Sequence, residues 1–168
     1  MRNIREYIKK CLAMCDETGI KYGKICEFKI NTRAKKRWGL CKRTTNGFVI
    51  EVNSILLDEA ASDEIGIIET LLHEIIHTCD KCFNHGAEWK RIASILNKKY
   101  NLNIKRTSNC TDKGVDEEIQ FEKMEYKYIV TCTCCGNKTY RSRTSNVIKN
   151  PHNYRCSCGG KLEVTTLM

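Results

Sequence analysis

The heptapeptide Leu71-Leu72-His73-Glu74-Ile75-Ile76-His77 matches the pattern H-E-x-x-H inside an apolar run without proline. Residues four apart lie on one face of an α-helix, so a helix here would direct His73 and His77 toward one metal ion. Imidazole nitrogens suit Zn²⁺, and a catalytic zinc keeps one position open for water. Glu74 would reach that water as a base. The alternative is an amphipathic helix whose two histidines are incidental or hydrogen-bonded.

A third histidine follows eight residues after His77, so three of the four histidines of the chain fall between residues 73 and 85. Two histidines, a third protein ligand and water make up the ligand set of a hydrolytic zinc site. Residues 78–84 are predicted to form a loop that can return to the metal. We therefore predict that His73, His77 and His85 hold a catalytic Zn²⁺ and that Glu74 is the catalytic base. Taken alone, His85 is better explained as a surface loop residue.

Apolar side chains at helical spacing predict three helices, at residues 3–18, around the H-E-x-x-H motif and at residues 86–100. The helix around the H-E-x-x-H motif is here called the metal helix, and its expected N-cap is Ser62. Its expected buried stripe consists of Ile65, Ile68, Leu72, Ile75 and Ile76. Alternating residues predict strands at 26–30 and 48–52, and Asn46-Gly47 is a strong hairpin signal. A small antiparallel sheet is therefore expected before the metal helix.

The basic segment between these strands surrounds a tryptophan. Basic and aromatic side chains together suit single-stranded nucleic acid, through phosphate contacts and base stacking. The predicted contacts in this segment are Arg33, Lys35, Lys36 and Arg37, with Trp38 beside them. The alternative is a solvated loop with Trp38 buried against the sheet.

Close cysteine pairs predict a second metal site near the C-terminal end. Residues 126–131 resemble a strand, Cys132-Thr133-Cys134-Cys135-Gly136 follow, and Cys156-Ser157-Cys158-Gly159-Gly160 come later. Two such pairs separated by a hairpin are typical of a zinc ribbon, whose metal supplies folding energy to a short module. We predict a structural Zn²⁺ held by Cys132, Cys135, Cys156 and Cys158. Cys134 in place of Cys135, His152 as a substitute ligand and a metal-free ribbon are open alternatives.

The formal net charge is +9, and the positive charge is concentrated in two blocks. Residues 1–60 carry 13 basic and 7 acidic side chains, and residues 126–168 carry 7 and 1. This distribution favours a polyanion as partner, although many basic proteins bind no nucleic acid. In the second block, Arg141 and Arg143 are predicted nucleic-acid contacts.

The length of 168 residues fits one main domain with a small appendage. The predicted boundaries are 1–110 for the core, 111–125 for a linker and 126–168 for the ribbon. No apolar run reaches the length of a membrane span and no secretory signal is evident, so the expected location is the cytoplasm, away from the membrane. The twelve cysteines are expected to be thiols or metal ligands. Cys79 and Cys82 fit a second metal site, a redox pair or two free thiols.

The combined pattern resembles the SprT-like family, which includes the bacterial SprT proteins and the Spartan-type proteases. The matching pieces are Arg37-Trp38-Gly39, Ile50-Glu51-Val52-Asn53, Leu71 to His77, His85-Gly86-x-x-Trp89-Lys90 and Cys158-Gly159-Gly160-Lys161-Leu162. The resemblance implies an α+β fold with a zincin-like metalloprotease core followed by a small β zinc ribbon. The ribbon departs from the family pattern C-x-x-C-G-G-K-L because Arg155 stands where the first cysteine would be.

For Spartan-type members the resemblance implies DNA-stimulated proteolysis of proteins bound or crosslinked to DNA. The expected function is therefore zinc-dependent proteolysis of DNA-associated proteins. The expected partners are DNA of single-stranded character and the polypeptides bound to it. One alternative is a catalytically silent, zinc-containing DNA-binding or regulatory protein. Another is a general cytoplasmic peptidase with no role on DNA.

Overall fold

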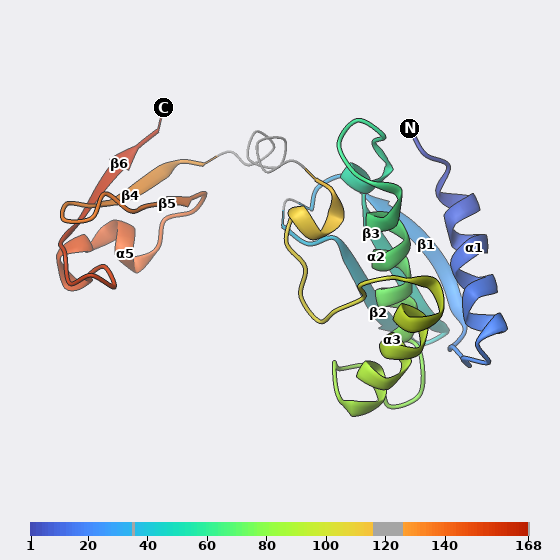
Figure 1. Cartoon of the computed structure of the whole chain (residues 1–168). Coiled ribbons are helices and arrows are strands. Elements are labelled where there is room, and N and C mark those ends of the chain that lie inside the picture. The colour runs from blue at the N-terminus through green and yellow to red at the C-terminus, as the bar shows by residue number, and fades with distance from the viewer. Residues whose placement is uncertain (35, 116–125, 168) are drawn as a thin grey trace. The chain divides into compact units, whose positions relative to one another are not determined.

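The computed structural model describes residues 1–34, 36–115 and 126–167. The chain divides into two compact units, residues 1–120 and 121–168, and each is described by itself (Figure 1). The helices of the first unit are α1 (Ile4–Glu17), α2 (Glu64–Ile76) and α3 (Ala87–Tyr100). Its strands are β1 (Ile25–Asn31), β2 (Gly39–Thr44) and β3 (Gly47–Asn53), and its 3₁₀ turns are η1 (Ser54–Leu57) and η2 (Thr111–Lys113). Helices and a small sheet thus combine in a mixed α and β fold, as predicted.

The sheet of the first unit has the strand order β1-β3-β2. β2 and β3 pair antiparallel through a turn at Thr45-Asn46, and Gly47 begins β3, so the hairpin that Asn46-Gly47 predicts is present. β1, however, runs parallel to β3, so the prediction of an antiparallel sheet is wrong for this strand. The reason is that β3 folds back between its two predecessors and runs in the direction of β1. Strand patterns in a sequence do not contain this neighbour order, because both arrangements bury the same alternating side chains.

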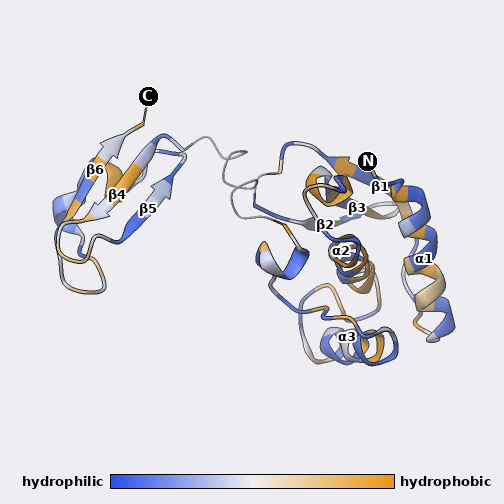
Figure 2. Cartoon of the chain, turned by 45° about the horizontal axis from the view of Figure 1, so that its top comes forward, coloured by the Kyte–Doolittle hydropathy of each residue, from blue (hydrophilic) through white to orange (hydrophobic). Residues whose placement is uncertain are grey.

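Helix α2 is buried on most of its circumference, and the buried residues include Glu69, Thr70 and Glu74 as well as the apolar ones. It contacts α1, α3 and both hairpin strands, and in Figure 2 it lies between the sheet and α3. The predicted stripe is correct except for Ile65, which is 54% exposed. Ile67 and Leu71 are fully buried in addition. The buried surface is wider than one stripe because neighbours enclose the helix from several sides.

The start of α2 also differs from the prediction. Its N-cap is Asp63 rather than Ser62. The Ser62 hydroxyl instead donates to the carbonyl of Leu56 and accepts a hydrogen bond from Arg2. Ser62 therefore makes tertiary contacts instead of capping the helix. Local sequence signals cannot distinguish these two roles of a serine before a helix.

The second unit is a three-stranded antiparallel sheet of order β5-β4-β6. Its strands are β4 (Tyr128–Cys132), β5 (Lys138–Arg141) and β6 (Leu162–Thr166), with the short helical elements α5 (Asn146–Lys149) and η3 (Pro151–Asn153) between β5 and β6. Its buried hydrophobic residues within the described range are Val130 and Cys132. So small an apolar core needs a further cross-link to stabilise a separate module.

The predicted linker, residues 111–125, falls mainly outside the described residues. Its first part belongs to the first unit, because η2 contacts α2 and Val115 is buried in the core cluster. The first unit therefore extends past the predicted boundary at residue 110. In the part of the chain that the structure describes, no helix combines the length and the apolar character that crossing a bilayer requires.

The burial of α2 predicts unequal effects of two substitutions on the same helix. Leu71→Ala removes a fully buried side chain and is expected to lower the free energy of unfolding by about 2–5 kcal/mol. Ile65→Ala is the matched control, and because Ile65 is exposed it should change this free energy by less than about 0.5 kcal/mol. Urea unfolding of both variants measures the difference. Equal losses would contradict the packing of α2 described here.

Candidate metal centre

The end of α2 brings two histidines together. The helix ends at Ile76, and His77 caps it with helical backbone angles (φ −63°, ψ −16°), so the i, i+4 spacing is kept. The Nε2 atoms of His73 and His77 are 3.3 Å apart. His77 is buried and His73 is half-buried. The helix thus presents both Nε2 atoms to one point, as the motif predicts.

The loop after α2 brings in the third histidine. It turns tightly through Lys81, whose φ of 58° is left-handed, and reaches α3 at Gly86. The Nε2 atom of His85 lies 3.0 Å from that of His73. The buried indole of Trp89, in the first turn of α3, packs against all three imidazoles, with ring centroids 4.7–5.8 Å apart.

Backbone carbonyls fix two of the rings from behind. Nδ1 of His73 donates to the carbonyl of Lys105 at 3.1 Å, and Nδ1 of His77 donates to the carbonyl of Cys82 at 2.8 Å. Each bond places the ring proton on Nδ1 and leaves the Nε2 lone pair facing the other histidines. Sequence reasoning missed both partners because a backbone carbonyl has no side-chain signature.

Burial favours the neutral form of these imidazoles. Desolvation, with a smaller contribution from the neighbouring histidines, lowers the pKa of His73 to about 3. Desolvation also lowers the pKa of His77 and of His85. Neutral imidazole is the form that binds a metal ion, so the cluster is ready to accept a cation near neutral pH.

The geometry of the three nitrogens is compatible with zinc. Two nitrogens at about 2.0–2.1 Å from a tetrahedral ion lie about 3.3 Å apart. The two short Nε2 separations, 3.0 and 3.3 Å, are close to that value, and all three candidate ligand atoms lie within 4.8 Å of one another. Three neutral imidazoles with no acidic ligand form a donor set that suits Zn²⁺.

Glu74 lies beside this cluster and against strand β2. The side chain is buried, and desolvation raises its pKa to about 8, although a backbone hydrogen bond from Cys41 opposes the shift. Gly39 provides the space for the carboxylate, because a Cβ there would lie 2.6 Å from Glu74 Oε1. Gly39, in the stretch Arg37-Trp38-Gly39, therefore has a steric role, because a side chain there would occupy the space of the Glu74 carboxylate. Its place in that motif was the signal that could have suggested such a role.

A cavity of about 180 Å³ adjoins His73 and Glu74. Its other lining residues are Arg37, Trp38, Gly39, Thr70, Arg106, Ser108 and Lys113. Trp38 is half-buried against the core cluster, and its Nε1 donates to the carbonyl of Ser108 at 3.2 Å. Trp38 is expected either to stack on a base or to be buried against the sheet. The structure favours the second interpretation, with the ring packed in the first unit next to the histidine cluster.

In the second unit, four cysteines form a compact group. The Sγ atoms of Cys132 and Cys158 are 3.5 Å apart, and those of Cys135 and Cys156 are 3.7 Å apart. Sulfurs at about 2.3 Å from a tetrahedral zinc lie about 3.8 Å apart. The group is therefore compatible with one zinc ion. Cys134 and His152 are exposed and outside this group.

The remaining cysteines of interest lie in the loop before His85. Cys79 and Cys82 are buried free thiols. Burial raises the pKa of Cys79 to about 12 and also raises that of Cys82. Neither belongs to a metal-binding group within the described residues. Of the three alternatives for this pair, the structure favours two free, unreactive thiols.

The predicted nucleic-acid contacts are exposed where the structure describes them. Arg33, Lys36 and Arg37 precede β2, while Lys35 lies outside the described residues. The guanidinium of Arg37 already pairs with Glu51 at 2.8 Å, which makes it less available to a phosphate. In the second unit, both predicted arginines are exposed, at positions 141 and 143.

A family model matches this arrangement. The model of the SprT-like family matches residues 7–108, more than half of the chain. The chain belongs to the SprT-like family. The match includes α2, the loop to His85 and α3, so the SprT-like part contains the histidine cluster of the first unit. No curated protein matches the chain. The cysteine group lies beyond the SprT-like match and stands on its own geometry.

The two clusters predict a zinc content that can be counted. Wild-type protein is expected to hold two zinc ions per chain, and His85→Ala should hold one, because it removes one of three ligands. His152→Ala is the matched control and should keep both ions, since its imidazole lies outside the cysteine group. Elemental analysis of purified protein measures the ratio. Loss of a zinc ion from the His152 variant would instead make this histidine a ribbon ligand.

Proposed function

We propose that the protein is a zinc-dependent endopeptidase of the HExxH class. The observation that carries the proposal is the convergence of three Nε2 atoms next to a buried carboxylate and an adjoining cavity. His73, His77 and His85 would hold Zn²⁺, which when bound supplies a Lewis acid for the scissile carbonyl. Glu74 accepts a proton from the attacking water and passes it to the leaving amine.

The environment of Glu74 suits both proton transfers. A general base is most effective when its pKa lies near the working pH, and burial moves the pKa of Glu74 upward into that range. A divalent cation in the neighbouring histidine cluster opposes this shift and favours the ionised carboxylate. The Cys41 backbone hydrogen bond and the space at Gly39 keep the carboxylate in place during the exchange.

Strand β2 supports an extended polypeptide as the substrate. It is the edge strand in the order β1-β3-β2, so among the described residues no strand pairs with its outer side, where the Cys41 backbone bonds Glu74. The Glu74 carboxylate contacts this strand, because it lies against Gly39 and accepts a backbone hydrogen bond from Cys41. A peptide added along β2 would therefore pass the catalytic carboxylate with one side chain near the cavity. Pairing along a strand edge suits an endopeptidase, because it needs no chain end.

We further propose that DNA localises the enzyme to DNA-associated or DNA-crosslinked proteins. This proposal rests on the resemblance to Spartan-type proteases and on the basic blocks of the sequence. Arg33, Lys35, Lys36 and Arg37 would contact DNA of single-stranded character from the first unit. Arg141 and Arg143 would do so from the ribbon, through phosphate contacts that carry no sequence preference.

Glu74→Gln tests the proposed chemistry. The amide keeps the shape of the side chain but cannot accept the proton, so cleavage of a protein substrate should fall by about 10²–10⁴-fold while zinc content is unchanged. Glu64→Gln, an exposed position on the same helix, is the control and should keep full activity. Gel-based cleavage with and without DNA, paired with elemental analysis, provides both readouts. Undiminished cleavage by the Glu74 variant would reject the mechanism.

The double variant Arg141→Gln/Arg143→Gln tests the DNA contacts. Each lost phosphate contact should reduce the slope of log affinity against log salt by about 0.7–0.9. Lys98→Gln/Lys99→Gln removes the same charge from α3 and should leave the slope nearly unchanged. Fluorescence anisotropy with single-stranded DNA measures both. Equal effects of the two double variants would argue against the ribbon contacts, and cleavage independent of DNA would favour a general peptidase.

A further inference from the structure

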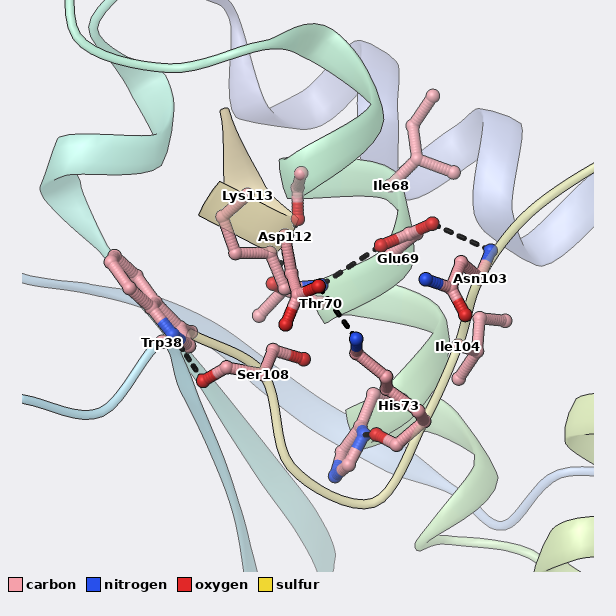
Figure 3. A network of polar contacts seen from close by, with 12 residues as sticks. Trp38, Ile68, Glu69, Thr70, His73, Asn103, Ile104, Ser108, Asp112 and Lys113 are labelled. Carbon is pink, nitrogen blue, oxygen red and sulfur yellow. Dashed lines mark hydrogen bonds and ion pairs between the residues drawn. The ribbon is translucent and has the colours of Figure 1, made fainter. Parts of the chain in front are cut away.

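Helix α2 carries a second buried carboxylate that the proposed chemistry does not use. Glu69 lies one turn before His73 and is 3% exposed. Its Oε1 accepts the backbone N–H of Asn103 at 2.6 Å, and its Oε2 pairs with Lys113 Nζ at 3.1 Å (Figure 3). Both side chains of this ion pair are 4% exposed. Desolvation makes such a pair a weak source of stability, so its role is better sought in what it positions.

The two partners of Glu69 are the ends of one stretch of chain. Residues 103–113, here called the return segment, follow α3 and end with η2. Within this segment, Lys105 provides the carbonyl that accepts the Nδ1 hydrogen of His73 at 3.1 Å. The Lys105 ammonium also pairs with Asp112 at 2.6 Å and closes the segment on itself. Glu69 therefore holds both ends of the loop that orients a candidate metal ligand.

Other anchors attach the return segment to the rest of the first unit. The Asn97 side chain accepts from the N–H of Ile104 at 2.7 Å and donates to its carbonyl at 3.0 Å. Trp38 Nε1 binds the carbonyl of Ser108. These contacts fix the segment to α3 and to the residues before β2. The contacts of Glu69 fix it to α2 itself, the helix on which His73 must keep its orientation.

We propose that Glu69 is a positioning residue for the metal centre. By holding the Asn103 N–H and the Lys113 ammonium, it keeps the Lys105 carbonyl on Nδ1 of His73 and the opposite nitrogen directed at the metal. Outer partners of ligating histidines change metal affinity by roughly 10–100-fold. The inference rests on the metal binding in the proposed function and does not require peptide hydrolysis.

Titration of the full-length apoprotein with Co²⁺ tests this inference. Thiolates bound to Co²⁺ give charge-transfer bands that imidazoles do not, so one titration reports both clusters and the cysteine group is an internal reference. Glu69→Gln should weaken Co²⁺ binding at the histidine cluster by roughly 10-fold or more and leave the thiolate bands unchanged. Glu64→Gln, which alters an exposed carboxylate on the same helix, should affect neither cluster.

A second variant separates positioning from general stability. Glu69→Met/Lys113→Met removes both buried charges at similar volume, so its melting temperature should exceed that of Glu69→Gln. Its affinity at the histidine cluster should nevertheless be roughly 10-fold weaker than wild type, because methionine offers the Asn103 N–H no acceptor. Wild-type affinity in this double variant would overturn the inference. Absence of histidine-cluster binding in the wild-type protein would instead refute the proposed function, and the inference with it.

Discussion

The enclosure of α2 is the constraint on which the site depends. A helix buried on most sides has no water for its polar side chains, so each of them needs a fixed partner from the surrounding chain. His73 and His77 find backbone carbonyls, Glu69 finds a backbone N–H and an ammonium, and Glu74 finds the backbone of Cys41. The packing that buries the helix therefore also orients the groups that carry the chemistry.

The same burial determines the ionisation states of the groups in the site. Desolvation lowers the pKa of the three histidines and raises that of Glu74, so without a cation the centre tends toward uncharged groups. A divalent ion suits this state, because it binds neutral imidazoles and favours the ionised form of a nearby carboxylate. Metal binding and ionisation of the base are thereby coupled. In the second unit a metal ion would have a structural role instead. The apolar core of that unit is small, so the four cysteines are its main potential cross-link.

The sequence predicted the elements of the site better than their surroundings. Helical spacing located α2 and α3, and the Asn-Gly signal located the β2–β3 hairpin, because these features depend on local chemistry. The parallel pairing of β1, the exposure of Ile65 and the tertiary role of Ser62 depend on neighbours that are distant in sequence. The carbonyls of Lys105 and Cys82 could not be predicted at all, since any residue type can supply them. The pairing of Glu69 with Lys113 joins positions 44 residues apart that have no shared motif.

The central claim is that three imidazoles hold one zinc ion next to Glu74. Anomalous diffraction from crystals of the full-length protein, measured on both sides of the zinc absorption edge, tests it most directly. The account predicts a zinc peak at about 2.0–2.1 Å from the Nε2 atoms of His73, His77 and His85, with a separate peak among the four cysteines. A zinc peak at the cysteines alone, in crystals grown with excess zinc, would contradict it.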